Sequence, residues 1–406
     1  MRSSIALTII SIFVISCNIP SEKSLAYTPG SFAYDIELLK KHYPVQILSR
    51  KEGEVQVAVV GAMQGRVMTS TATGRTGNSL GWINHSLIAS QVFEPHINAY
   101  GGEDRFWMGP EGGQFAIFFE PEDEFTFEDW QTPGIIDTAV YQLTRQDSSQ
   151  LTYEKTFSLQ NYTGTQFRAH VKRRIDLLDD EEIGANLGVA IPEGVKAVSF
   201  QSVNELTNIG QKTWVRDSGL LSIWILGMFP PSPQTTIFLP VKGGENLEAQ
   251  INDAYFGEVG PDRLVVSDSI IFFKGDGLYR SKIGIPPQIA KPLMGSYDAE
   301  NQVLTFVQYS LGEEELYVNS LWELQEEPYR GDVVNSYNDG PLDDAGQQLG
   351  PFYELESSSA AQELAEGEHM VHIHRTFHFT GSESQLNPIF QAKLGIRLDS
   401  LNRIFN

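Results

Sequence analysis

The chain has 406 residues, and its 52 Asp and Glu against 29 Lys and Arg give a formal net charge of −23 at pH 7. Such an acidic chain repels nucleic acid, so we expect no nucleic-acid partner. Hydrophobic residues make up 41% of the chain, which is enough for a core, and after the N-terminal segment no stretch is long and apolar enough to span a bilayer.

The first 17 residues have the features of an export signal. Arg2 is followed by an apolar run over residues 5–15, which is too short for a permanent membrane span. The residues before Cys17 resemble the lipobox of bacterial lipoproteins, in which the cysteine is lipidated and becomes the mature N-terminus. The alternative is an ordinary cleaved signal. We therefore predict a lipoprotein signal over 1–17 and a lipid-anchored protein of the bacterial cell envelope, periplasmic or at the outer membrane.

The rest of the chain is typical of an all-β protein. Helical patterns are few: residues 32–42 with Ser31 as N-cap, and one or two turns within 358–365. Short apolar or alternating segments recur between Gly, Pro, Asn and Asp, and they are rich in Val, Thr, Phe and Tyr. After a tether over 18–31 we expect one large β-sandwich domain over 32–406. Examples of the predicted strands are 55–60, 114–119, 151–157, 167–173, 263–266 and 303–307.

The segment 100–113 combines glycines, acids, an arginine and three kinds of aromatic residue. Glycine allows close backbone approach, and carboxylates and guanidinium make directional hydrogen bonds. Flat rings offer an apolar stacking face. This mixture suits a sugar, so Glu103, Arg105 and Trp107 are predicted to contact a carbohydrate. The alternative is a Gly-rich loop with a buried tryptophan; a phosphate-loop signature is absent.

Two later segments carry polar residues at strand spacing. Asn204 and Asn208 point to one side of a strand, and a buried Asn must be hydrogen-bonded. Asn208 is typical of a hairpin end, whereas Asn204 is either structural or a ligand contact. Arg280 and Lys282 also share a strand face. In so acidic a chain they either pair with carboxylates or reach into a polar pocket as ligand contacts.

Glu354 and Glu356 are a candidate pair of functional carboxyls. Strand alternation puts them on one face about 7 Å apart, opposite Tyr353 and Leu355. Two carboxylates so placed repel each other unless they are solvated, paired or share a proton. Either glutamate can serve as a catalytic base or ligand contact, and a solvated face is the alternative.

Four of the eight histidines lie within residues 369–378. His372, His374 and His378 share one strand face. That face is either a polar outer surface or part of a site, with His374 as an acid–base group and His372 as a sugar contact. A His-x-His pair binds a transition metal only when a third ligand converges, and no two-part metal signature is present. We therefore expect no metal and no cofactor, and keep a metal-dependent enzyme as a third hypothesis.

Taken in order, these blocks resemble the galactose-mutarotase-like superfamily. Residues 101–107 are similar to its Gly-Gly-x-Arg-x-Trp segment, and residues 203–210 resemble the strand that carries Asn-His-x-Tyr-Phe-Asn in aldose 1-epimerases. Residues 353–356 are similar to the strand with the epimerases' catalytic glutamate. From about residue 32 the chain is similar to a family of bacterial lipoproteins in that superfamily. The resemblance implies a β-supersandwich of two large, twisted, mostly antiparallel sheets with a sugar site on the concave face.

The resemblance also implies an acid–base pair at the sugar ring, in which a histidine protonates the ring oxygen and a glutamate takes the anomeric proton. Glu354 matches the glutamate. Asn204 stands where the histidine is expected, and an amide cannot donate a proton at neutral pH. This departure favours a carbohydrate-binding protein, with a sugar epimerase, mutarotase or related carbohydrate-active enzyme using Glu354 as the alternative.

Overall fold

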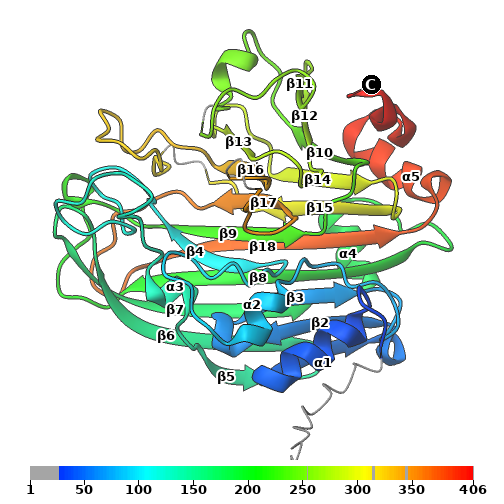
Figure 1. Ribbon diagram of the computed structural model, residues 1–406, viewed down its shortest axis with the longest axis horizontal. Helices are drawn as coiled ribbons and strands as arrows, with labels where there is room; N and C mark the ends of the chain where they lie inside the picture. Colours follow the sequence, from blue (N-terminus) through cyan, green and yellow to red (C-terminus); the bar gives the residue numbers. More distant parts are fainter. Residues whose placement is uncertain (1–26, 254, 313–315, 343–345, 406) are drawn as a thin grey trace, which may run out of the picture.

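Two sheets of unequal size face each other in the computed structural model, which describes residues 27–405 except 254, 313–315 and 343–345 (Figure 1). The predicted signal, Cys17 and most of the predicted tether lie outside the described residues. Strands dominate, all their pairings are antiparallel, and the described helices are short. The predicted fold class, an all-β supersandwich with few short helices, is confirmed.

The larger sheet has ten strands in the order β11-β12-β10-β14-β15-β18-β8-β7-β6-β5. Its centre is the long pair β8 and β18, which match residue by residue from Lys196–Thr380 to Thr207–His369. The bounds are β5 Gln142–Gln146, β6 Gln150–Gln160, β7 Gln166–Leu177, β8 Lys196–Asn208, β10 Thr235–Pro240, β11 Leu264–Val266, β12 Ile270–Lys274, β14 Leu293–Asp298, β15 Val303–Tyr309 and β18 His369–Thr380.

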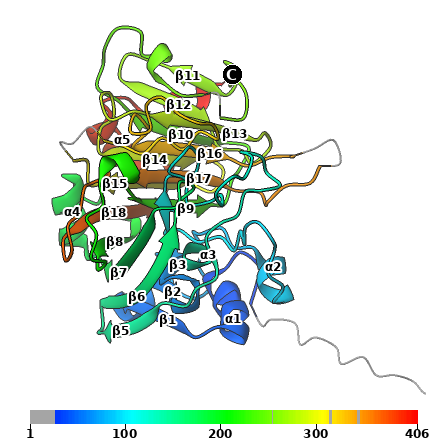
Figure 2. The same cartoon turned by 90° about the vertical axis from the view of Figure 1, so that its left-hand side faces the viewer.

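The second sheet has five strands in the order β13-β16-β17-β9-β4, and Figure 2 shows it stacked against the middle of the larger sheet. A third sheet, β1-β2-β3, lies at one side with α1 and α2 (Figures 1 and 2). The bounds are β4 Arg105–Gly109, β9 Ser222–Phe229, β13 Ser281–Ile285, β16 Val334–Asn338 and β17 Tyr353–Ser358, and β1 Val45–Arg50, β2 Val55–Val60 and β3 Arg66–Thr71.

Helices cover edges and one outer face of the sheets. Helices α4 and α5 pack on the side of the ten-stranded sheet that faces away from the five-stranded sheet (Figure 2). None of the described helices has the length and apolarity needed to cross a membrane. The α-helices are α1 Phe32–His42, α2 His85–Ser90, α3 Gly134–Asp137, α4 Asp180–Leu187 and α5 Glu383–Leu394, and the 3₁₀ helices are η1 Lys51–Gly53, η2 Gly61–Met63, η3 Arg216–Ser218, η4 Glu248–Gln250 and η5 Leu398–Arg403.

The local sequence explains α1, whose predicted bounds are confirmed. The Ser31 hydroxyl accepts a hydrogen bond from the Tyr34 N–H, which satisfies one of the free donors of the first turn. Lys40 and Lys41 lie in the last turn, where they complement the helix dipole. The apolar face, with Phe32 and Ile36, packs with residues of the three-stranded sheet.

Two sequence predictions of secondary structure are wrong. Residues 114–119 have strand-like composition but form turns and bends, because their rings pack into a loop cluster in which Phe118 contacts Trp130 and Phe119 contacts Trp322. Residues 358–365 form no helix; β17 ends at Ser358 and an irregular segment follows. In both cases tertiary contacts outweigh local propensity.

Candidate functional site

The candidate site lies on the outer face of the five-stranded sheet, which points away from the ten-stranded sheet. Side chains alternate along a strand, so Phe106, Ile225 and Leu355 face the core while their neighbours face outward. The outward set combines two carboxyls, two cations and two indoles from four strands. Its members are Arg105 and Trp107 of β4, Trp224 of β9, Lys282 of β13, and Glu354 and Glu356 of β17.

Glu354 and Arg105 form a buried ion pair on this face. Nη2 of Arg105 donates to Oε1 of Glu354 over 2.8 Å, and the two side chains are 4% and 8% exposed. The Arg105 guanidinium lies 4.4 Å from the centre of the Trp107 ring. Burial raises the pKa of Glu354 to about 8; Arg105 opposes this rise, while the charge of Glu356 and a hydrogen bond between the two carboxyls add to it. Glu354 therefore binds a proton much more tightly than a free glutamate does.

Glu356 and Lys282 form the second ion pair. The Lys282 ammonium lies 3.1 Å from Oε2 of Glu356, and the Trp224 Nε1–H donates to the same oxygen over 3.1 Å. The ammonium also lies 4.8 Å from the centre of the Trp224 ring. Burial lowers the pKa of Lys282, but the charges of Glu356, Glu111 and Glu354 outweigh it and raise the pKa overall. The predicted role of Lys282 as a partner of carboxylates is thus seen directly.

A small cavity lies beside Trp224, Lys282 and Ser222 on this face. Its volume is about 10 Å³, which is room for about one water molecule. Among the described residues, Oε1 of Glu356, Oγ of Ser222 and Nε1 of Trp107 are buried without a hydrogen-bond partner. Buried polar atoms without partners are rare in proteins and point to a ligand or ordered water.

Asp332 and Tyr255 close one side of the cavity. The Tyr255 hydroxyl donates to Oδ2 of Asp332 over 2.7 Å. Burial raises the pKa of Asp332 to about 6, because hydrogen bonds and the charge of Lys282 only partly offset the desolvation. Burial, together with Asp332, raises the pKa of Tyr255 well above its usual value. Sequence reasoning missed both residues, because they lie in irregular segments.

Arg280 lies just before β13, close to the same face. Its guanidinium lies 3.8 Å from the centre of the Phe256 ring. It also interacts with Tyr337, which pairs with Lys282 across β13 and β16. The structure therefore brings together Arg105, Trp107, Lys282, Arg280 and Glu354 from the predicted set.

Four other predicted residues lie elsewhere, in the space between the sheets. Glu103 accepts a hydrogen bond from Ser70 and is held at 2.8 Å by Nε2 of His378. The Asn204 side chain accepts from Arg173 over 3.0 Å and donates to Ser202. Glu103 and Asn204 are fully buried and have structural partners, so the geometry does not bring them to the sugar face predicted for them.

His372 and His374 are also buried between the sheets. The Ser357 hydroxyl contacts Nε2 of His372 at 2.8 Å and Nδ1 of His374 at 2.9 Å. Burial lowers the pKa of each ring to about 3, so both are neutral at pH 7. Ser357 points inward from β17, whereas Glu354 and Glu356 point outward. The two histidines are thus on the opposite side of the strand from Glu354, and their outer-surface alternative is wrong.

Within the part of the chain that the structure describes, no group of three His, Cys, Asp or Glu side chains is placed to hold a metal ion. The third hypothesis, a metal-dependent enzyme built on His372 and His374, therefore finds no third converging ligand among the described residues.

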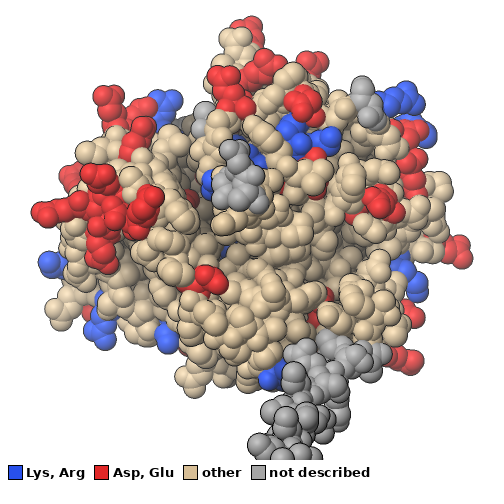
Figure 3. All heavy atoms as spheres, viewed as in Figure 1, with Lys and Arg blue, Asp and Glu red and all other residues tan. Residues whose placement is uncertain are grey.

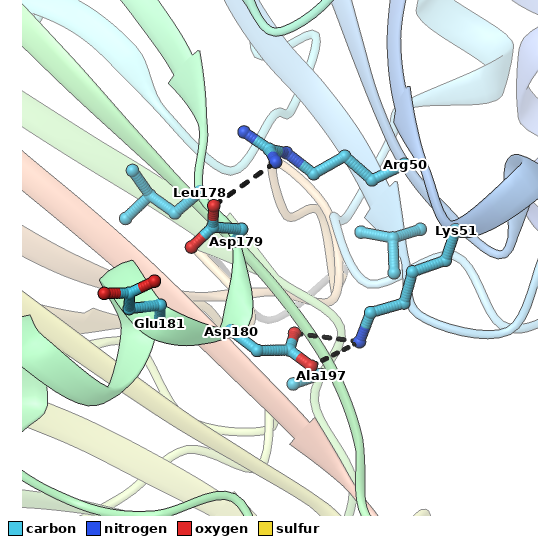
Figure 4. A pocket seen from close by; sticks show the side chains of 8 residues that line it. Arg50, Lys51, Leu178, Asp179, Asp180, Glu181 and Ala197 are labelled. Carbon is cyan, nitrogen blue, oxygen red and sulfur yellow. Dashed lines mark hydrogen bonds and ion pairs between the residues drawn. The ribbon is translucent and has the colours of Figure 1, made fainter.

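A hollow of about 480 Å³ lies on another part of the surface, between the end of β1 and the start of α4 (Figure 4). Lys51 binds Asp180 over 2.7 Å, and Arg50 lies 3.5 Å from Asp179. The Arg50 guanidinium also donates to the Leu177 carbonyl oxygen over 3.0 Å. Both cations bind groups within the chain. We therefore assign this hollow to the contact between the hairpin of β1 and β2 and helix α4.

The fold and this site define a β-supersandwich with a buried acid–base cluster on one sheet. Residues 30–405 match the model of a family described as a family of unknown function (DUF6786), and the chain belongs to that family. No match was found among curated proteins.

Several solved structures share this architecture. The Slr1438 protein from Synechocystis sp. PCC 6803 is 10% identical with a TM-score of 0.50, over 84% of this chain and 96% of that one. A galactose mutarotase-like protein from Lactobacillus casei is 10% identical with a TM-score of 0.48, over 83% and 100%. A galactose mutarotase related enzyme from Lactobacillus acidophilus is 7% identical with a TM-score of 0.45, over 84% and 98%. At a TM-score of 0.50 the Slr1438 protein shares the fold of this chain.

Proposed function

We propose that the protein binds and processes a carbohydrate on the outer face of the five-stranded sheet, with Glu354 transferring a proton. The observation that carries this proposal is the buried Glu354 carboxyl, held between Arg105 and a second carboxyl. A carboxyl with a strongly perturbed pKa, flanked by specific charges, is a recurrent feature of catalytic sites.

The surroundings of Glu354 suit a sugar. The rings of Trp107 and Trp224, whose centres are 5.5 Å apart, offer apolar surface for the C–H face of a pyranose. Arg105 and Lys282 can donate to hydroxyl oxygens, and the carboxyls can accept from hydroxyl hydrogens. An apolar wall with a few convergent polar groups is the usual composition of a small-molecule site.

The two carboxyls divide the acid and base roles. The pKa of Glu354 is raised to about 8, whereas Glu356 is ion-paired with Lys282. Two carboxyls whose environments differ in this way supply an acid and a base at once. In anomer interconversion Glu356 takes the anomeric hydroxyl proton while Glu354 protonates the ring oxygen, and the ring C–O bond breaks. Rotation and closure with reversed proton transfers give the other anomer.

A carbohydrate-binding protein without turnover is the second candidate. The cavity beside Trp224 and Lys282 favours it, because its volume is about 10 Å³ whereas ligand pockets usually enclose about 300–1,000 Å³. The position of His372 and His374 between the sheets also favours it, since these two imidazoles lie on the opposite side of β17 from the carboxyls of the outer face.

Proton NMR of pure sugar anomers mixed with the purified protein separates these functions. Faster approach to anomeric equilibrium, or new product signals, supports processing at Glu354. Line broadening of the sugar without turnover supports binding alone. If a broad panel of neutral, amino and acidic sugars shows neither effect, the carbohydrate proposal is overturned.

We further propose that Cys17 is lipidated and anchors the protein in the bacterial cell envelope. The support is the apolar run followed by Ser16-Cys17. Cells expressing the full chain and fed radiolabelled palmitate are expected to yield a labelled protein in the membrane fraction. The Cys17→Ser variant is expected to lose the label and leave that fraction, with Ser24→Ala as the control. A Cys17→Ser protein that stays labelled would contradict the proposal.

A further inference from the structure

An open groove lies beside the small cavity at Trp224 and Lys282. It has a volume of about 940 Å³, at the upper end of the usual range for ligand pockets. Its walls come chiefly from two loop segments, residues 110–132 after β4 and residues 316–332 before β16, and from η3. The lining includes Phe115, Tyr329, Arg216, Asp217, Gln288 and Glu327.

The groove and the closed cavity share a wall. Val318 and Ser320 line the cavity, while Leu316 and Tyr329 of the same segment line the groove. Gln114 ties the two segments together, because it donates to the Gln325 carbonyl oxygen over 2.9 Å and accepts from the Gln325 N–H over 3.0 Å. In Figure 1 these loops lie together beyond one end of the sheets. The groove therefore lies next to the cavity, across the segment that contains Leu316 and Ser320.

The groove has the composition of a sugar-binding surface. The rings of Phe115 and Tyr329 stack with centres 6.0 Å apart and planes 24° apart, and the Arg216 guanidinium lies 5.4 Å from the Tyr329 centre. Tyr329 is fixed because its hydroxyl donates to the Arg216 carbonyl oxygen. Arg216 and Asp217 are exposed at the rim, where they can bind hydroxyls with little rearrangement.

The charge around the groove restricts the ligand further. The lining itself holds three acids, Asp217, Glu326 and Glu327, against Arg216 and Arg330. The two loop segments carry further exposed acids, and Figure 3 shows acidic side chains gathered at the end of the molecule where these loops lie. Acidic groups on a ligand would be repelled there, whereas neutral hydroxyls are not. The exposed acids of the two segments are Glu120, Glu122, Glu124, Glu128, Glu323, Glu326 and Glu327.

We infer that the substrate class is an oligosaccharide without acidic groups, with its terminal sugar at Glu354 and the following sugars in the groove beside Phe115 and Arg216. This inference rests on the proposed carbohydrate function and adds the length and charge of the ligand. A monosaccharide fills only the site at Glu354 and leaves the 940 Å³ groove without a ligand.

Saturation-transfer NMR and titration with defined sugars test the inference. The probes are glucose and N-acetylglucosamine, the neutral tetrasaccharides maltotetraose, cellotetraose and N-acetylchitotetraose, and acidic tetragalacturonate. We expect at least one neutral tetrasaccharide to bind about tenfold more tightly than its monosaccharide, and tetragalacturonate to bind more weakly than any neutral tetrasaccharide. The Arg216→Ala and Phe115→Ala variants are expected to lose about three- to tenfold of tetrasaccharide affinity while monosaccharide affinity is unchanged.

Arg216 is exposed, so its replacement leaves the core intact, and Val371→Ala on β18 is the control at an exposed site. Equal affinity for single sugars and tetrasaccharides, or unchanged tetrasaccharide affinity in both groove variants, overturns the inference while the proposed function stands. Preference for tetragalacturonate also overturns it. If neither single sugars nor tetrasaccharides bind, both the inference and the proposed function fail.

Discussion

Replacing Glu354 by Gln is expected to lower any sugar turnover by about 100- to 10,000-fold, the usual contribution of a positioned acid–base group. Gln keeps the shape and a hydrogen-bonding oxygen for Arg105 but cannot transfer a proton at neutral pH. Sugar affinity is therefore expected to change much less than the rate. The measurement is the anomer-exchange rate by NMR at saturating sugar. The exposed Glu366→Gln variant is the matched control, and an unchanged rate in Glu354→Gln would contradict the assignment.

The same substitution has a predictable effect on stability. The pKa of Glu354 is raised from 4.5 to about 8, so the folded state holds this proton more tightly than the unfolded chain. Its stabilising contribution is complete below pH 4.5 and is lost as the pH rises to 8. Glu354→Gln is expected to flatten the decline of the unfolding free energy across this window, as measured by denaturant titration at several pH values. An unaltered pH profile would show that Glu354 is not the group responsible.

Replacing Arg173 by Ala is expected to lower the unfolding free energy by about 3–5 kcal/mol, because it leaves a buried charge unpaired. Arg173 is fully buried between the sheets and binds the Asp104 carboxylate. It also donates to the Asp104 carbonyl oxygen over 2.7 Å, the Gly65 carbonyl oxygen over 3.1 Å and Asn204 Oδ1 over 3.0 Å. Three separate segments lose a donor when this side chain is removed.

The neighbouring Arg174 offers a matched control. It points to the opposite side of β7, is 41% exposed and pairs with Asp176 at 3.0 Å. An exposed ion pair contributes about 1 kcal/mol or less, so Arg174→Ala is expected to be nearly neutral. Chemical denaturation of both variants measures the difference. Equal destabilisation by the two substitutions would show that the buried network does not depend on Arg173.

The sequence was sufficient to predict the class of fold, α1 and the division of β17 into two faces. Period-two alternation predicted Glu354 and Glu356 on one face of the strand and Leu355 on the other. The structure confirms this arrangement, with Leu355 in the core. Alternation also put His372 and His374 together on one face of β18. It could not say which face is buried. Here the polar face is buried, whereas the apolar face is exposed at Val371 (43%) and buried at Phe377 and Phe379.

The site could be predicted only in part because its contacts join distant parts of the chain. Arg105 and Glu354 are 249 residues apart, and Lys282 and Glu356 are 74 residues apart. No local pattern encodes such pairs. The glycines near Arg105 indicated only that it contacts a ligand, and they did not indicate that it pairs with Glu354. The loop at residues 114–119 was missed for a related reason. These residues have the β propensity of a strand, but the ring of Phe119 packs against Trp322 of another loop.

The buried polar face of β18 also has a consequence for how the chain finds its native pairing. If β18 paired with β8 one residue out of step, Val371, Ile373 and Arg375 would turn inward and His372 and His374 would turn out. Ser357 would then lose both imidazole partners, and a guanidinium would enter a space that already holds Arg173. An all-aliphatic layer would tolerate such a slip far better. The polar layer thus discriminates against this misaligned pairing of β18 with β8.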